Sequence, residues 1–151
     1  MTDKVEAAKR AAATEAVKNH WPSNPRYVGI GSGTTIVYVV EAIKKSGVNV
    51  SGVSFVPTGY QSAKLIYDAG LNICRFDDLA QGVKLDVAFD GADEVDEDLN
   101  CIKGGGACLF QEKLVAMRAK EFVCVAGMHI HSSSSLQADM EQITENCSRG
   151  S

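Results

Sequence analysis

Hydrophobic positions along this chain follow two alternating patterns. Short runs with apolar residues at successive positions, such as 27–30 and 122–126, are typical of strands buried on both faces. Longer segments between these runs carry apolar residues at helical spacing. The predicted strands are 27–30, 50–56, 71–74, 85–90 and 122–126, and the predicted helices are 3–20, 36–45, 60–69 and 108–120. This alternation predicts an α/β fold with an open, mostly parallel sheet covered by helices on both faces, a Rossmann-like three-layer arrangement.

Local signals mark the ends of several predicted helices. Asp3 and Glu6 have the spacing of a capping box, which predicts the start of the first helix. Two prolines within residues 22–25 cannot continue that helix. Gly47 and Gly70 follow the second and third helices, where a glycine in the left-handed conformation commonly ends a helix.

Composition narrows the class of protein. The chain has 151 residues, of which 45% are hydrophobic, which suits one domain with a real core. A net charge of −4 argues against nucleic acid as a partner, and the apolar runs are far shorter than a membrane span. The charged N-terminus has no apolar segment typical of a signal peptide. Five cysteines without CxxC or CxxH spacing predict small buried hydrophobes in a reducing compartment, so we expect a cytoplasmic protein.

A change in composition divides the chain after residue 126. Residues 1–126 are predicted to form the α/β domain. Residues 127–151 contain four consecutive serines at 132–135 and few large apolar residues, so we expect a divergent, poorly ordered tail. A helix over 136–147 is the alternative for part of this tail.

Three chemically suggestive segments follow predicted strands. They are 31–35, 57–61 and 90–112. In a parallel α/β sheet, ligands bind outside the carboxyl ends of the strands. The three segments therefore predict one ligand site at this edge of the sheet.

The first segment, Gly31-Ser-Gly-Thr-Thr35, joins a strand to a helix. Glycines let backbone amides approach an anion, the helix N-terminus favours negative charge, and the hydroxyls add donors. A phosphate or carboxylate would fit, and an ordinary tight turn is the alternative. Thr34 stands where the third glycine of a dinucleotide fingerprint would fall, so NAD is not expected.

The acidic motif Asp90-Gly-Ala-Asp93-Glu94 follows the predicted strand 85–89 directly. Paired carboxylates in a turn suit the binding of sugar hydroxyls or the movement of protons. A solvated acidic loop is the alternative, because further acids follow at 96–98. A Mg²⁺ site is a third interpretation, since hard oxygen ligands are abundant here.

Lys103 and the three following glycines predict an oxyanion site. Successive glycines cost backbone entropy on ordering, which is worthwhile where amides must approach a ligand closely. Glu112 lies on a predicted helix with apolar neighbours one turn away on both sides. An apolar surrounding disfavours the charged carboxylate and favours proton uptake, as a general base requires. A structural ion pair of Glu112 with Lys103 or Lys113 is the alternative.

Taken together, these motifs resemble the ribose-5-phosphate isomerase A family. The resemblance rests on Val28-Gly-Ile-Gly-Ser-Gly-Thr-Thr35, Leu85-Asp-Val-Ala-Phe-Asp-Gly-Ala-Asp-Glu94 and Ile102-Lys-Gly-Gly-Gly-Ala107, followed by Gln111-Glu-Lys113. Segments 9–13 and 56–58 are also similar to the family. The resemblance spans about residues 3–126.

The resemblance implies an aldose–ketose isomerase that interconverts D-ribose 5-phosphate and D-ribulose 5-phosphate in the non-oxidative pentose phosphate pathway. It implies neither a metal nor an organic cofactor. Glu112 matches the general base that moves a proton between C2 and C1 through a cis-enediolate. Asp90 and Asp93 match acids assigned to ring opening and hydroxyl binding. Lys103 and the following glycine amides match the group that stabilises the developing oxyanion.

The resemblance also implies a set of substrate-binding residues. These are Ser32, Gly33, Thr34, Thr35, Gly91, Ala92, Gly104, Gly105, Gly106 and Lys9, with Lys9 near the phosphate. The implied partner is a small sugar phosphate, with a homo-oligomer as a further expectation. Neither nucleic acid nor a membrane is expected as a partner.

The chain departs from the family pattern after residue 126. Where the family has Asp-x-Ser-Lys, this sequence has Gly127-Met-His-Ile130, and the second small domain of the family is not recognisable. We therefore expect a C-terminally truncated or variant chain with reduced stability or activity. Two alternatives to an active isomerase stay open: a non-catalytic sugar-phosphate-binding module and an inactive fragment of the isomerase.

Overall fold

The fold is described from a computed structural model that covers residues 2–92, 94–95, 101–102, 109–126 and 130–133. The helices are α1 (Thr2–His20), α2 (Thr34–Lys45), α3 (Tyr60–Asp68) and α4 (Leu109–Arg118), with a 3₁₀ turn η1 at Phe76–Asp78. The strands are β1 (Tyr27–Ile30), β2 (Ser54–Pro57), β3 (Asn72–Ile73), β4 (Val87–Ala92), β5 (Glu94–Val95), β6 (Cys101–Ile102), β7 (Phe122–Ala126) and β8 (Ile130–Ser133).

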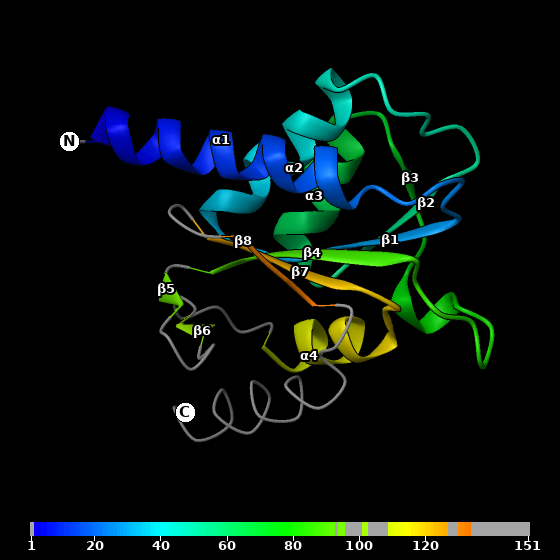
Figure 1. The fold of residues 1–151 in the computed structure, drawn as a ribbon. Coiled ribbons are helices and arrows are strands. Elements are labelled where there is room, and N and C mark those ends of the chain that lie inside the picture. The colour runs from blue at the N-terminus through cyan, green and yellow to red at the C-terminus, as the bar shows by residue number, and fades with distance from the viewer. Residues whose placement is uncertain (1, 93, 96–100, 103–108, 127–129, 134–151) are drawn as a thin grey trace.

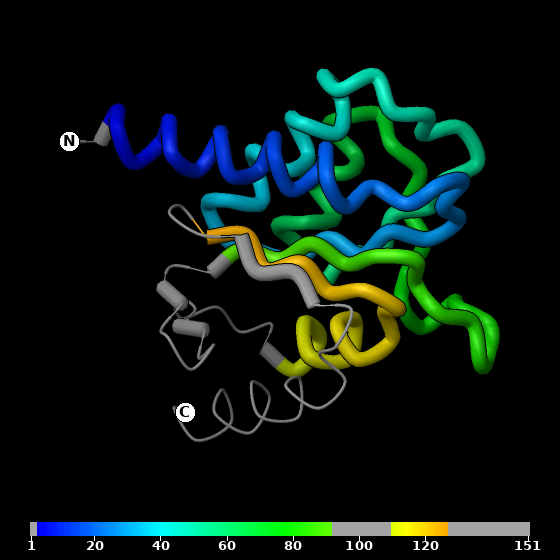
Figure 2. The backbone as a smooth tube through the Cα atoms, viewed as in Figure 1, coloured from blue at the N-terminus to red at the C-terminus, as the bar shows by residue number. Residues whose placement is uncertain are grey.

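Six strands form one sheet in the order β3-β2-β1-β4-β7-β8. The first five are parallel, and β8 pairs with β7 in the antiparallel direction. Helices α1, α2 and α3 cover one face of this sheet, and α4 covers the other (Figure 1). The backbone trace shows the same arrangement, with α1 and α2 on the side opposite α4 (Figure 2). The predicted three-layer α/β fold is confirmed.

Two apolar clusters fill the space between the layers. Phe55, Phe89 and Ile36 are fully buried in the cluster beneath α1, α2 and α3. Ala88 and Val115 belong to the second cluster, on the side of α4. Successive residues of a strand point to opposite faces, so Phe89 and its neighbour Ala88 serve different clusters. This explains why the buried strands read as continuous apolar runs in the sequence.

Gly29 allows α4 to pack close to the centre of the sheet. A Cβ atom at this position would lie 2.7 Å from Cγ1 of Val115 and 2.9 Å from Cβ of Ala88, which is closer than real Cβ contacts. The glycine therefore sets how near α4 lies to β1. Glu112 is one helical turn before Val115, so the same packing brings the carboxylate toward the end of β1.

Several element boundaries differ from the sequence predictions. Residues 50–53 are not part of β2, because the Val53 amide donates to the Val50 carbonyl at 3.1 Å in a turn. Strand β4 starts and ends two residues later than predicted, so Asp90 lies within it. The predicted capping box is wrong, because Asp3 lies in the first turn of α1 rather than before it. Glycines 47 and 70 do have positive φ values beyond their helices, as predicted.

Part of the segment predicted to be a tail joins the sheet. Ile130–Ser133 pairs with β7 as the edge strand β8. The predicted helix over 136–147 lies outside the described residues, as does most of the segment 127–151. The boundary after residue 126 stays a prediction.

Candidate functional site

The strand order reverses between β1 and β4. The chain continues from β1 through α2 to β2 on one side, and from β4 through α4 to β7 on the other. The two helices lie on opposite faces of the sheet (Figure 1). In open α/β sheets, ligands bind at the carboxyl ends of the strands where the strand order reverses in this way. Residues from β4, α4 and the loop after β1 meet at this edge.

Asp90 is a buried carboxylate at the switch point, with 5% of its surface exposed. Strand β1 ends opposite Phe89, so Asp90 lies beside the turn that leaves β1 on one side, and it pairs with Cys124 of β7 on the other. Its Oδ1 atom accepts the Ser32 amide at 3.2 Å and the Gly91 amide at 2.8 Å. These two bonds fix the orientation of the Asp90 carboxyl group.

Gly31 makes room for the Asp90 side chain. A Cβ atom here would overlap Oδ1 and Cγ of Asp90, and the Gly31 amide donates to the Phe89 carbonyl at 2.8 Å. The sequence suggested that this glycine lets amides approach an anion. The structure gives it a different purpose, which is close contact between the turn and the carboxylate.

Glu112 reaches the same place from α4. Only 7% of its surface is exposed, and its neighbours Val115 and Ala116 on the same helical face are also buried. The Ser32 hydroxyl donates a hydrogen bond to Oε1 of Glu112. Ser32 therefore contacts both buried carboxylates, Asp90 through its amide and Glu112 through its hydroxyl. The predicted buried environment of Glu112 is confirmed.

The amides of the glycine turn already have acceptors within the protein. Gly31 donates to Phe89, Ser32 donates to Asp90, and the Gly33 amide donates to Oε1 of Gln61 at 2.9 Å. The expectation that these glycine amides bind an anion therefore needs revision. The donors that lack acceptors within α2 are those of its first turn, starting at Thr34.

Lys9 projects from α1 to the start of α2. Its Nζ donates to Oγ1 of Thr34 at 2.9 Å, and it also pairs with Glu6 at 3.3 Å. The Tyr38 hydroxyl donates to the other oxygen of Glu6, and this hydrogen bond, with the Lys9 charge, holds the pKa of Glu6 below its ordinary value. An ionised Glu6 in turn keeps the Lys9 ammonium beside Thr34. The cation predicted for phosphate binding thus lies at the N-terminus of α2.

Thr35 and Gly91 pack against each other beside Ser32, where the strand order reverses. Thr35 is 3% exposed, and a Cβ at Gly91 would lie 3.2 Å from Cβ of Thr35. Thr35 thus lines the packed floor of the site with its side chain, while its amide belongs to the first turn of α2. Asp93, Lys103 and the glycines at 104–106 lie outside the described residues, and only the backbone of Ala92 is described.

Gln61 is a contact residue that the sequence did not single out. The segment 57–61 was predicted to lie at a strand end, with no role for a particular side chain. Gln61 follows β2 at the second position of α3, and its amide group bonds both the N–H and the C=O of Gly33. A polar side chain at the start of a helix after a buried strand was the available signal.

The Mg²⁺ interpretation finds no support among the described residues, where no group of three or more His, Cys, Asp or Glu side chains could hold a metal. Cys74 is a free thiol, and burial raises its pKa. In the described part of the chain, no helix has both the length and the hydropathy needed to cross a bilayer.

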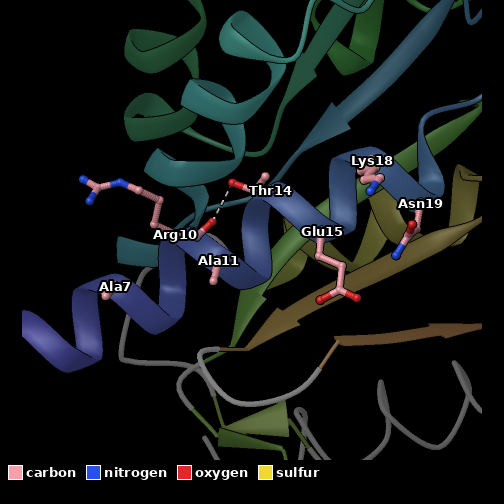
Figure 3. A pocket seen from close by; sticks show the side chains of 7 residues that line it. All are labelled: Ala7, Arg10, Ala11, Thr14, Glu15, Lys18 and Asn19. Carbon is pink, nitrogen blue, oxygen red and sulfur yellow. Dashed lines mark hydrogen bonds between the residues drawn. The ribbon is translucent and has the colours of Figure 1, made fainter.

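A hollow of about 540 Å³ runs along α1 and is separate from these residues. It is lined by Ala7, Arg10, Ala11, Thr14, Glu15, Lys18 and Asn19. Figure 3 shows Arg10 and Glu15 extending from different sides of the helix, with Thr14 bonded back to the Arg10 carbonyl. None of the lining residues is a predicted site residue, so this hollow is not the candidate site.

In comparisons with known proteins, this chain is similar to ribose-5-phosphate isomerases. Residues 54–140 match the family model described as ribose 5-phosphate isomerase A (phosphoriboisomerase A). A ribose-5-phosphate isomerase of Debaryomyces hansenii is 53% identical over 132 residues, which cover 87% of this chain and 51% of that protein. The enzyme of the same name from Schizosaccharomyces pombe is 55% identical over 123 residues, covering 81% of this chain and 43% of that protein.

Solved structures show the same similarity. Ribose 5 phosphate isomerase A from Neisseria gonorrhoeae superposes with a TM-score of 0.68 at 39% identity, covering 79% of this chain and 50% of that one. A D-ribose-5-phosphate isomerase in complex with phospho-erythronic acid gives a TM-score of 0.67 at 36% identity, covering 79% and 51%. The chain thus spans about half the length of the curated relatives that it matches.

Proposed function

Because this chain belongs to the ribose 5-phosphate isomerase A family, we propose that it interconverts D-ribose 5-phosphate and D-ribulose 5-phosphate. One observation carries the proposal: two buried carboxylates, Asp90 and Glu112, converge on Ser32 at the switch point of the sheet. A related structure contains phospho-erythronic acid, which supports a sugar phosphate as the ligand class.

Glu112 is proposed as the general base. Its carboxylate takes the proton from C2 of the open-chain aldose, leaving a cis-enediolate, and returns it to C1 as the hydroxyl proton moves from O2 to O1. The Glu112 side chain is almost completely buried at this end of the sheet. The Ser32 hydroxyl orients the carboxylate by donating to Oε1.

Asp90 is proposed to act on the sugar hydroxyls and in ring opening, together with Asp93. The amides of Ser32 and Gly91 occupy Oδ1 of Asp90, which fixes the orientation of the carboxylate. Lys103 and the glycines at 104–106 are proposed to stabilise the enediolate oxygen. Their roles rest on the sequence match alone, because they lie outside the described residues.

The phosphate is proposed to bind at the N-terminus of α2. Lys9 supplies a cation beside Thr34, and the amides of the first helical turn supply donors aligned with the helix dipole. Ser32, Thr35, Gly91 and Ala92 complete the proposed binding surface. The mechanism uses no metal and no organic cofactor.

An isomerase assay of this chain beside Glu112→Gln tests the proposal. We expect turnover of ribose 5-phosphate by the chain and a loss of roughly 100-fold or more in kcat for the variant, since general-base catalysis contributes 10² to 10⁴. Glu15→Gln, an exposed glutamate on α1, serves as the matched control. Equal activity in the chain and Glu112→Gln would remove Glu112 as base. Binding of ribose 5-phosphate without turnover would favour a sugar-phosphate-binding module.

We further propose a cytoplasmic location and a homo-oligomeric state, with neither nucleic acid nor a membrane as a partner. The free thiol of Cys74 agrees with a reducing compartment. Fractionation of cells and light scattering of the purified chain test the two proposals.

A further inference from the structure

Gln61 makes a two-point contact with a single residue far away in the sequence. Its Oε1 accepts the Gly33 amide at 2.9 Å, and its Nε2 donates to the Gly33 carbonyl at 2.9 Å. Twenty-eight positions separate the two residues. A side-chain amide that bonds both groups of one residue fixes the two peptide planes on either side of it, because each peptide unit is planar.

Gly33 is the residue of the turn that most needs such a restraint. It caps the N-terminus of α2 with φ of 106° and ψ of −178°, a conformation that L side chains rarely adopt. Nothing lies within 4 Å of the place where its Cβ would be, so packing does not hold it there. Glycine has the largest backbone freedom of any residue. The Gln61 amide supplies the restraint that packing does not.

The start of α3, from which the Gln61 side chain extends, is held in place by hydrogen bonds. Ser62, the next residue, is fully buried, and its hydroxyl accepts the amides of Thr58 at 3.0 Å and Gly59 at 3.2 Å. The Thr58 amide lies 3.2 Å from the Ile30 carbonyl at the end of β1. The start of α3 is thereby tied to the same strand end that leads into the Gly33 turn.

The orientation of one peptide unit connects this contact to the ligand. The Gly33 carbonyl, which accepts from Gln61, and the Thr34 amide belong to the same planar unit. Fixing the carbonyl therefore fixes the direction of the Thr34 N–H, the first donor of α2. We propose that Gln61 is a positioning residue that holds this peptide unit and so aims the Thr34 amide at the phosphate of the sugar substrate. The inference rests on the proposed function for its ligand.

The role proposed for Gln61 concerns the affinity for the substrate and not the rate of the proton transfer. Glu112 is held by Ser32 on the other side of Gly33, and Asp90 holds the Ser32 amide independently of Gln61. Removal of the Gln61 amide should therefore weaken phosphate binding more than it slows proton transfer. Two hydrogen bonds of ordinary strength correspond to a factor of roughly 5 to 150 in Kd if their whole strength is lost from binding. We expect a smaller rise, of roughly 3- to 30-fold, because the Thr34 amide is reoriented and not removed.

The test compares Gln61→Met with the matched control Gln81→Met, which makes the same nearly isosteric change at an exposed glutamine elsewhere. Hydrogen exchange of the Gly33 amide is measured by NMR, and the Kd and KM for ribose 5-phosphate are measured with kcat. We expect faster exchange at Gly33 and a roughly 3- to 30-fold rise in Kd and KM for Gln61→Met, with kcat within about threefold and no change in the control.

Unchanged exchange at Gly33, or an unchanged Kd despite faster exchange, would overturn the inference. A fall in kcat as large as the rise in KM would also overturn it, because it would indicate general disruption of the site. If the unmodified chain does not bind ribose 5-phosphate, the proposed function fails, and exchange at Gly33 then decides separately whether Gln61 holds the turn.

Discussion

The Ser32 hydroxyl donates a hydrogen bond to the Glu112 carboxylate, and this contact joins the turn after β1 to helix α4 across 80 residues of sequence. The contact passes the end of the sheet, because α2 and α4 cover opposite faces (Figure 1). It holds the proposed base in a fixed orientation where the strand order reverses between β1 and β4.

Replacement of Ser32 by alanine should slow the reaction without unfolding the protein. The amide bond from Ser32 to Asp90 uses the backbone and persists, whereas the bond to Glu112 is lost. A misoriented general base typically costs about tenfold or more in kcat. Steady-state kinetics of Ser32→Ala beside Ser23→Ala, an exposed serine, measures the effect. An unchanged kcat would show that Ser32 does not orient Glu112.

Replacement of Gly31 by alanine should destabilise the fold and displace Asp90. The added Cβ would overlap the Asp90 carboxyl group, while the backbone of Gly31 is not in the left-handed region. Forcing extra atoms into a packed site costs about 1–3 kcal/mol in the free energy of unfolding. Urea unfolding measures this cost, and Asp90→Ala combined with Gly31→Ala provides the control. If the overlap is the cause, Gly31→Ala should lower the free energy of unfolding less in the Asp90→Ala background than in the unmodified chain.

Replacement of Lys9 by methionine should weaken substrate binding in a salt-dependent way. The variant keeps most of the aliphatic stem but loses the ammonium that contacts Thr34. Charge-assisted contacts of this kind correspond to a rise in KM of roughly tenfold or more at low ionic strength. Lys4→Met, at an exposed position of the same helix, is the control. A KM equal to that of the unmodified chain would place the phosphate elsewhere.

Because of Asp86, the free energy of unfolding should decrease as the pH falls into the acidic range. Burial works to raise the pKa of Asp86, but hydrogen bonds from the Arg26 and Tyr27 amides and from Lys120 outweigh it and hold the pKa below its ordinary value. A folded-state pKa below the unfolded one means that the folded protein binds fewer protons. The stabilisation is therefore present above the unfolded pKa and is lost as pH falls through the folded pKa.

Urea unfolding between pH 7 and pH 3 tests this expectation. Asp86→Asn should be less stable than the unmodified chain at pH 7, and the difference should shrink as the pH falls below about 4. Asp77→Asn, at an exposed position, is the control and should show no comparable change. A difference that is constant over the whole range would mean that the ionised form of Asp86 does not stabilise the fold.

The sequence predicted the layers of this fold because its periodicities are local. Strand β1 and strand β7 have the predicted bounds, since three or four successive buried residues can be read directly as a strand between two layers of helix. The bounds of β2 and β4 were wrong by one to four residues. Turns such as the one from Val50 to Val53, and the continued pairing of β4 with β7, depend on contacts that the local pattern does not contain.

The sequence predicted which residues belong to the candidate site, but it did not predict how they are arranged in space. The isolated carboxylate on an apolar helix face identified Glu112, and its burial was confirmed. The glycine turn was identified as well, but the purpose of its glycines was not. Gly31 makes room for Asp90, and the Gly33 amide is occupied by Gln61.

By itself, the sequence determined the α/β class, the order of the elements and the residues with suitable chemistry. Each of these follows from the identity of a residue and from its near neighbours. The tertiary structure alone decided which partners meet: Ser32 with Asp90 and Glu112, and Gln61 with Gly33. The reason is physical, because such contacts arise where the strand order reverses and α4 packs closely against Gly29, and both depend on the arrangement of distant segments in space.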